Sequence, residues 1–135
     1  MSDGKRLELA LLLLRIGVFV VMFMWSLDKI FKPDHAVAIF ESFYYLAGIA
    51  TGLMTLIGIA QLLIELAFLA GLWKFWTYGF VLVTHAVSTV SSWRQYLDPF
   101  DNLLFFAAIP MLAACVALFL LRDADTLWSL GSKRR

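Results

Sequence analysis

Residues 7–30 read LELALLLLRIGVFVVMFMWSLDKI, and this apolar run decides the fold class of the chain. An α-helix rises about 1.5 Å per residue and needs about 20 mostly apolar residues to cross the hydrocarbon core of a bilayer. Three further stretches meet that requirement, at residues 43–72, 75–93 and 103–121. The sequence therefore predicts an all-α, integral membrane four-transmembrane-helix bundle. It forms a single transmembrane domain over residues 1–135, with a basic C-terminal tail at residues 122–135.

The composition indicates that lipid is the natural solvent of this chain. Of its 135 residues, 62% are hydrophobic and 16% are charged, a larger apolar share than ordinary soluble domains carry. A formal net charge of +1 gives no reason to expect a nucleic-acid partner. The single cysteine, Cys115, can form neither an internal disulfide nor a Cys-x-x-Cys redox pair. Residues 7–30 contain no clear small-residue cleavage site, so we expect a retained first span and not a removed signal.

Basic residues are distributed unequally between the two ends of the predicted bundle. One end collects Lys5, Arg6, Lys74, Arg122, Lys133, Arg134 and Arg135, and the other collects Lys29, Lys32 and Arg94. The richer end normally faces the cytoplasm, so we expect cytoplasmic N and C termini. Two interpretations of the tail stay open, one along the inner leaflet and one as a frayed end. The segment 31–42 is expected to form a contact surface outside the cytoplasm.

Two opposite charges lie inside the first two predicted spans. Arg15 is eight residues from Leu7, and Glu65 is eight residues before Trp73, so both are expected about 12 Å from the same boundary. A charge at membrane depth costs roughly 2.5–3.5 kcal/mol on insertion scales and normally has a partner. The sequence therefore predicts an intramembrane ion pair between Arg15 and Glu65. Whether that pair only fixes helix register or belongs to a functional site stays open.

Polar side chains also recur at helical spacing on the second and third predicted spans. Gln61 and Glu65 share one face, and His85 and Ser88 share another. Faces this polar are expected to turn away from lipid and, with Arg15, to line one internal pocket. The residues expected to bind a ligand are Arg15, Gln61, Glu65, His85 and Ser88. His85 has two open interpretations, a strut between helices or a proton donor to a bound head group.

No metal site is expected from this sequence, and the catalytic residues are unknown. A bis-histidine haem site would need His35, which lies in the predicted outer segment. The methionines and Cys115 are soft ligands, but they fall on different helix faces. We therefore expect no cofactor bound through a motif of the chain, and treat a quinone or a lipid as the candidate bound molecule.

Three segments resemble the DoxX family of membrane proteins. Residues 11–31, LLLLRIGVFVVMFMWSLDKIF, resemble its opening span, with an early arginine and a Gly-x-x-Lys-like ending that here begins with Ser26. Residues 58–73, GIAQLLIELAFLAGLW, resemble its second span, and RDADTLWSL at 122–130 is loosely similar to its closing motif. The resemblance implies a four-helix protein of the bacterial inner (cytoplasmic) membrane, linked to quinone or thiol redox systems. Because the family tends to have glycine where Ser26 stands, close helix packing there is not implied.

These observations support hypotheses from different classes. The first is a small membrane subunit of a redox complex that binds a quinone-like amphipathic molecule between its helices, with the electron source on a partner. The alternative is a non-catalytic accessory subunit that packs against a larger membrane protein complex. A third is a small proton-coupled transporter, against which the expected pairing of Glu65 counts. Membrane lipids and other membrane protein subunits are the expected partners.

Overall fold

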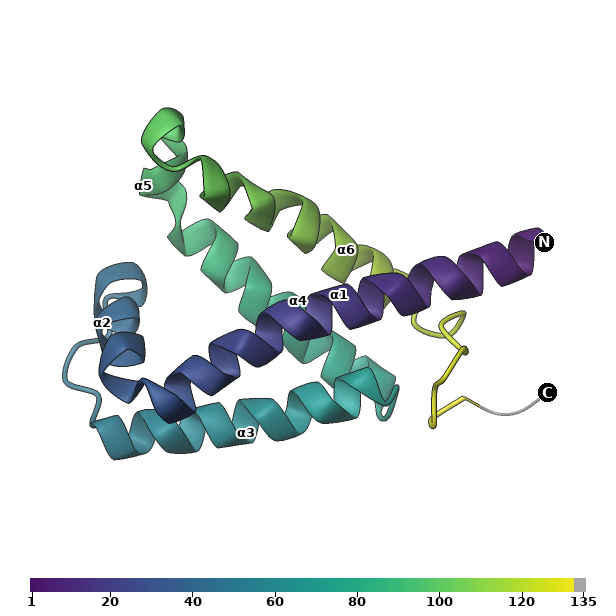
Figure 1. The fold of residues 1–135 in the computed structure, drawn as a ribbon, viewed down its shortest axis with the longest axis horizontal. Coiled ribbons are helices and arrows are strands. Elements are labelled where there is room, and N and C mark those ends of the chain that lie inside the picture. Colours follow the sequence, from purple (N-terminus) through teal and green to yellow (C-terminus); the bar gives the residue numbers. More distant parts are fainter. Residues whose placement is uncertain (133–135) are drawn as a thin grey trace.

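The long helices come together toward the end of the molecule where the chain begins and diverge toward the other end, where a short helix lies between them (Figure 1). The computed structural model describes residues 1–132, all of whose regular elements are helical. Lys133, Arg134 and Arg135, part of the predicted basic tail, lie outside the described residues. The α-helices are α1 (Asp3–Phe31), α2 (Pro33–Tyr44), α3 (Thr51–Leu69), α4 (Lys74–Ser91), α5 (Trp93–Tyr96) and α6 (Ala108–Leu120), and the 3₁₀ helices are η1 (Pro99–Asp101) and η2 (Leu103–Ala107).

The junction between α1 and α2 follows from a proline. The Ser2 hydroxyl caps the start of α1 by accepting a hydrogen bond from the Lys5 amide, at 3.4 Å. Because Pro33 disfavours helical backbone at the residue before it, Lys32 leaves the helix with φ −129° and ψ 55°. Pro33 then starts α2, where its missing N–H costs no hydrogen bond. The segment expected only as an outward contact surface is thus largely helical.

The predicted second span, residues 43–72, is wrong at its beginning. Tyr44 still belongs to α2, residues 45–50 are not helical, and α3 begins at Thr51. Tyr45 takes a left-handed conformation (φ 56°) that ends α2, and Gly48 (φ 78°) turns the chain toward α3. An apolar run cannot by itself reveal such a turn, because tyrosine, leucine and alanine are as hydrophobic outside a helix as inside it.

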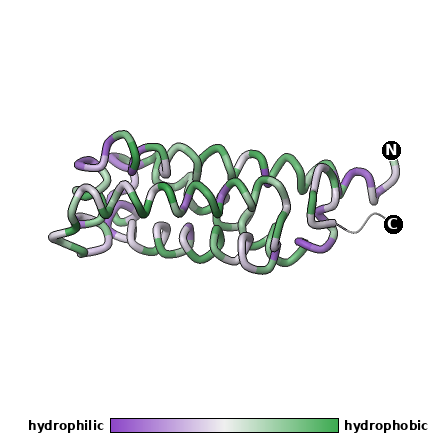
Figure 2. The backbone as a smooth tube through the Cα atoms, turned by 90° about the horizontal axis from the view of Figure 1, so that it is seen from below, coloured by the Kyte–Doolittle hydropathy of each residue, from purple (hydrophilic) through white to green (hydrophobic). Residues whose placement is uncertain are grey.

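Within residues 1–132, three helical segments are long and apolar enough to cross a bilayer, which indicates a multi-pass membrane protein. They are Asp3–Phe31, Thr51–Leu69 and Leu103–Leu120. The third begins as 3₁₀ helix η2 and becomes α-helical at Ala108, two residues before Pro110, a position in the first turn where proline is tolerated. Hydrophobic residues occupy the middle of the molecule, and hydrophilic residues gather toward its ends (Figure 2). α4 matches the third predicted span, residues 75–93, in position but is not among these three segments.

α1 and α3 are antiparallel and approach closely at Gly58. A Cβ at that position would lie 2.7 Å from the Lys29 Cβ and 3.1 Å from the Ser26 carbonyl oxygen. Small residues permit this approach between helices in lipid. Further along, a core cluster joins α1, α3, α4 and α6, and includes Phe68, Tyr78 and Cys115. Residues 121–132 fold back over the same end of the bundle at which the chain begins (Figure 1).

Candidate functional site

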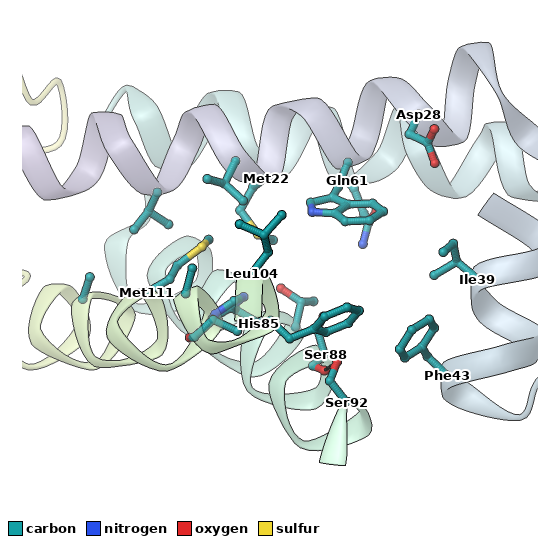
Figure 3. A pocket seen from close by; sticks show the side chains of 18 of the residues that line it. Met22, Asp28, Ile39, Phe43, Gln61, His85, Ser88, Ser92, Leu104 and Met111 are labelled. Carbon is teal, nitrogen blue, oxygen red and sulfur yellow. Dashed lines mark hydrogen bonds between the residues drawn. The ribbon is translucent and has the colours of Figure 1, made fainter. Parts of the chain in front are cut away.

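A cavity of about 760 Å³ lies between α1, α2, α4, η2 and α6. This volume falls in the range of sites that hold small organic ligands. Figure 3 shows side chains from separate elements converging on it, including Met22, His85 and Met111. From α3, only Gln61 reaches it. The cavity is therefore the natural place to look for a bound molecule.

The two ends of the cavity differ in chemistry. Toward the middle of α1 and α6 its walls are aliphatic, with Leu14, Val18 and Ala114. Toward α2 the cavity gains aromatic and polar side chains beside the aliphatic Ala36 and Ile39. These aromatic and polar residues are Trp25, Asp28, Lys29, Phe40, Phe43, Tyr44, Gln61, Ser88, Ser92 and Phe105. An elongated molecule with a polar head and an apolar chain would match this division.

His85 lines the cavity, but its Nε2 is already engaged. That nitrogen lies 2.9 Å from the carbonyl oxygen of Ala108, so it carries the proton and donates across to α6. The Thr89 hydroxyl donates to the His85 carbonyl at 2.8 Å and stands 3.3 Å from Nε2. The structure therefore shows His85 as a strut between α4 and α6, and its Nε2 proton is not free for a ligand.

Gln61 and Ser88 also line the cavity, so three of the five residues expected to bind a ligand lie on its walls. The buried Oε1 of Gln61 has no hydrogen-bond partner within the described part of the chain. An orphaned buried carbonyl is costly unless something else pairs with it. Gln61 is thus the polar group on these walls with the clearest unmet hydrogen-bonding capacity.

Arg15 and Glu65 are not among the residues that line the cavity, and the predicted ion pair between them is wrong. Glu65 accepts from the Ser26 hydroxyl, which lies 2.8 and 2.7 Å from its two oxygens. Arg15 instead pairs with Asp125, with 3.5 Å between Nη1 and Oδ2. Each of the two side chains thus has its own partners, at a different depth in the bundle.

Helix geometry explains this error. Gly58 of α3 faces Lys29 of α1. Because the two helices are antiparallel, seven residues toward the C-terminus of α3 correspond to seven residues toward the N-terminus of α1. Glu65 therefore lies level with Met22 and not with Arg15. Side chains also tilt toward the N-terminus of their own helix, so on antiparallel helices two long side chains lean apart. Counting from the edges of apolar runs missed the real register because α1 begins at Asp3, before the run at Leu7.

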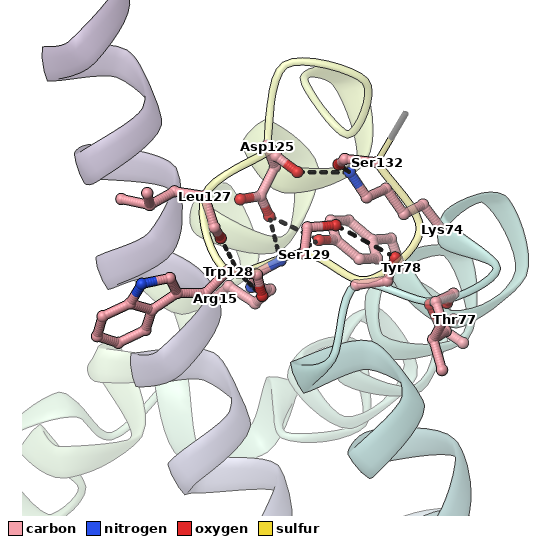
Figure 4. Close-up of polar contacts among 11 residues, drawn as sticks. Arg15, Lys74, Thr77, Tyr78, Asp125, Leu127, Trp128, Ser129 and Ser132 are labelled. Atoms are coloured by element: carbon pink, nitrogen blue, oxygen red, sulfur yellow. Dashed lines mark hydrogen bonds and ion pairs between the residues drawn. The ribbon is translucent and has the colours of Figure 1, made fainter. Parts of the chain in front are cut away.

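Arg15 is fully buried in a polar cluster that ties the C-terminal segment to the bundle (Figure 4). Its Nη2 donates to the carbonyl oxygens of Leu127 at 2.6 Å and Trp128 at 3.2 Å, and its Nη1 donates to the Tyr78 hydroxyl at 3.3 Å. That hydroxyl donates to Oδ2 of Asp125 at 2.6 Å, and the Lys74 ammonium donates to the Asp125 carbonyl. Guanidinium groups suit such sites because they present several donors in a fixed plane.

This cluster settles the position of the described part of the tail. The Leu130 amide donates to the Ala70 carbonyl at 2.9 Å, and the Thr126 hydroxyl donates to Glu8 at 3.0 Å. Residues 122–132 are thus packed on the bundle and not frayed. Asp125 was missed because it follows the last apolar run and resembles an ordinary solvated tail residue. The one available signal was that Arg15 needed a buried acid at its own end of α1.

We expect Ser26→Ala to destabilise the protein by about 1–3 kcal/mol, because the buried carboxyl of Glu65 would lose its hydroxyl donor. Thermal unfolding in detergent micelles measures the effect. Ser42→Ala, an exposed change on α2, is the matched control and should leave the unfolding temperature unchanged. Adding Glu65→Gln should recover part of the loss, and equal stability of Ser26→Ala and the parent protein would contradict the assigned contact.

No metal centre is evident among residues 1–132, in which no three His, Cys, Asp or Glu side chains lie close enough to share an ion. Comparison with protein-family models, with curated proteins and with solved structures finds no match for this chain. The case for its function therefore depends on the geometry of its own residues.

Proposed function

We propose that this protein is a small subunit of a membrane redox complex that holds a quinone-like amphipathic molecule in the cavity beside α2. The observation that carries the proposal is the division of that cavity into an aliphatic end and an aromatic, polar end. An isoprenoid chain suits the first, and a head group with hydrogen-bonding oxygens suits the second. The resemblance to the DoxX family points to the same class of ligand.

In this proposal α4 is the fourth span of the bundle. Its length, Lys74–Ser91, suffices to cross most of the hydrocarbon layer, and its polar residues face inward. Nε2 of His85 bonds to α6, and the Tyr78 hydroxyl bonds to Asp125, so these polar atoms are paired inside the bundle. With four spans both termini share one side of the membrane, and the excess of Lys and Arg there favours the cytoplasmic side of a bacterial inner membrane.

In this proposal the chain supplies a binding site, and its sequence contains no cofactor-binding motif. We therefore assign electron donation or acceptance to a partner subunit, and ligand placement to this one. The proposal therefore includes a surface on this chain that contacts the partner subunit. A purely accessory subunit, the alternative function, would share the fold but would not depend on an occupied cavity.

Filling the cavity tests the proposal. Gly17 lines it, and a Cβ there would meet no atom within 4 Å, so Gly17→Phe places a ring in the space without an initial backbone clash. We expect the protein purified in native lipid to retain an amphipathic molecule that mass spectrometry detects after extraction. Gly17→Phe should retain at most about a tenth as much. A loss of about 1.4 kcal/mol of binding free energy lowers the affinity tenfold, and the ring should displace contacts worth more than that.

Gly52→Phe is the matched control. Gly52 lies on α3 in equally open space but is not among the residues that line the cavity. It should retain the molecule at the level of the parent protein. Equal retention by all three proteins, or an empty parent protein, would contradict the proposal. An empty cavity combined with co-purification of a larger membrane complex at fixed stoichiometry would support the accessory function instead.

A further inference from the structure

The α2 end of the cavity combines flat aromatic walls with an under-used donor, the Lys29 ammonium, and an unpaired buried acceptor, Oε1 of Gln61. We infer that it binds the head of the amphipathic ligand, and that this head is an uncharged planar ring with hydrogen-bond-accepting oxygens, held by Lys29 and Gln61. The ligand chain then extends toward Val18 and Ala114, along the aliphatic end. This inference rests on the proposed function and adds the orientation and chemical class of the ligand.

Aromatic side chains in the cavity are confined to the α2 end. They are Trp25 of α1, Phe40, Phe43 and Tyr44 of α2, and Phe105 of η2. The Phe43 and Phe105 rings stack with their centroids 6.1 Å apart, so they bridge α2 to η2 across the end of the cavity. Flat aromatic surfaces pack well against a planar ring, whereas aliphatic walls suit a flexible chain. Because the aromatic and the aliphatic walls lie at opposite ends of the cavity, a planar head should lie at the α2 end and a flexible chain at the other end.

Lys29 supplies the strongest donor at this end. Its side chain is only 8% exposed, yet the ammonium makes one long hydrogen bond, 3.4 Å to the Trp25 carbonyl. It also lies 5.8 Å from the centroid of the Phe40 ring. An ammonium has three donors, so, among the contacts of residues 1–132, Lys29 keeps unused hydrogen-bonding capacity beside the cavity that it lines. A carbonyl oxygen placed there would accept from it.

Gln61 adds a second polar group on the facing helix. Its amide points into the cavity (Figure 3), and its buried Oε1 lacks a partner in the described chain. A side-chain amide offers two donors and an acceptor, so it can pair with either a carbonyl or a hydroxyl of a ring. Gln61 can therefore hydrogen-bond to a quinone head in both its oxidised and its reduced form.

The charges around this end favour an uncharged head. Both carboxyl groups near Lys29 have other partners: Glu65 accepts from Ser26, and Asp28 lies 2.8 Å from Nδ1 of His35. Asp28, the next residue along the chain, nevertheless compensates the Lys29 charge through space. An anionic head would add a negative charge beside the Asp28 carboxylate, whereas a neutral acceptor takes the Lys29 donor without that repulsion. The same site should therefore discriminate against fatty acids of equal chain length.

Ligand binding to the full-length protein in detergent micelles tests the inference, with decyl-benzoquinone and dodecanoate as probes. We expect the parent protein to bind the quinone at least about tenfold more tightly than the fatty acid. Lys29→Met and Gln61→Leu should each weaken quinone binding by about tenfold, the size expected for one lost hydrogen bond of about 1.4 kcal/mol. Lys32→Met, an exposed neighbouring change, is the control and should bind as the parent does.

A fluorescence measurement does not depend on the folding of those variants. Two otherwise parental proteins would each keep one tryptophan, Trp25 beside the proposed head or Trp128 at the opposite end, with the others changed to phenylalanine. We expect saturable quenching of Trp25 by decyl-benzoquinone, abolished by Gly17→Phe, and no saturable quenching of Trp128.

The outcomes separate this inference from the proposed function. If Gly17→Phe abolishes binding while Lys29→Met and Gln61→Leu bind as the parent does, the cavity site stands and the assigned head position is wrong. Tighter binding of dodecanoate than of the quinone would overturn the uncharged head. Saturable quenching of Trp128 in place of Trp25 would reverse the orientation. Binding of neither probe would overturn both the inference and the proposed function.

Discussion

Replacing Arg15 with methionine is expected to detach the C-terminal segment and to destabilise the protein by about 3–5 kcal/mol. The side chain is fully buried and holds two backbone carbonyls of residues 127 and 128, the Tyr78 hydroxyl and Asp125. Without the guanidinium, the Asp125 carboxylate stays buried with no cation of residues 1–132 within salt-bridge distance, and two carbonyls lose their donor. Methionine keeps the unbranched apolar stem of the side chain but is shorter than arginine, so the loss combines the missing donors with a smaller change in packing.

Hydrogen exchange at the Leu130 amide is the sharpest measurement, together with the unfolding temperature in detergent. That amide donates to the Ala70 carbonyl only while the segment is seated on the bundle, so its protection should fall when Arg15 is lost. Arg6→Met is the matched control. Arg6 forms only an exposed pair with Asp3, at 3.7 Å, and its loss should leave both readings unchanged.

A second substitution separates charge burial from general disruption. Adding Asp125→Asn to Arg15→Met removes the uncompensated carboxylate, so the double variant should recover a substantial part of the lost stability. Arg15→Lys should recover less, because an ammonium cannot reach carbonyls, hydroxyl and carboxylate together in one plane. Unchanged Leu130 protection in Arg15→Met would show that the cluster does not hold the segment.

Apolar run length predicted the helical, membrane-embedded character of the chain because the cost of burying polar backbone in lipid leaves few alternatives. It could not place the boundary at Tyr45 and Gly48, where backbone conformation ends α2 while hydrophobicity continues. The candidate site was predicted in part: helical spacing put Gln61, His85 and Ser88 on inward faces, and all three line the cavity. Spacing along a helix indicates which face a residue occupies, and this was enough to predict that these three residues face inward.

Partner choice among buried charges was not accessible from spacing. Arg15 and Glu65 each had one obvious opposite charge in the apolar spans, but the actual partners lie elsewhere: Asp125 follows the last span, and Ser26 is uncharged. The direction in which each side chain leans, and the level at which antiparallel helices meet, depend on tertiary packing. Lys29 was expected on the inward face of the first span but not among the residues that bind a ligand, since a lysine at the end of a span resembles an ordinary interface anchor.

The level at which α1 and α3 meet depends on Gly58, and Gly58→Ala is expected to destabilise the protein by about 1–3 kcal/mol. The added Cβ would lie 2.7 Å from the Lys29 Cβ, 3.0 Å from Cγ1 of Ile30 and 3.1 Å from the Ser26 carbonyl oxygen. A Cβ and a backbone carbonyl cannot move aside as a flexible chain end can, so the helices themselves must separate.

Gly52→Ala on the same helix is the matched control. A Cβ at Gly52 meets nothing within 4 Å, so there alanine only adds helix propensity and should be neutral or stabilising by up to about 1 kcal/mol. Opposite signs for the two substitutions, measured by thermal unfolding in detergent, are the expected result. Gly58→Ala should also weaken ligand retention, because a shift of α1 against α3 moves Lys29 relative to Gln61. A stabilising Gly58→Ala with unchanged retention would mean that α1 and α3 do not approach closely at this glycine.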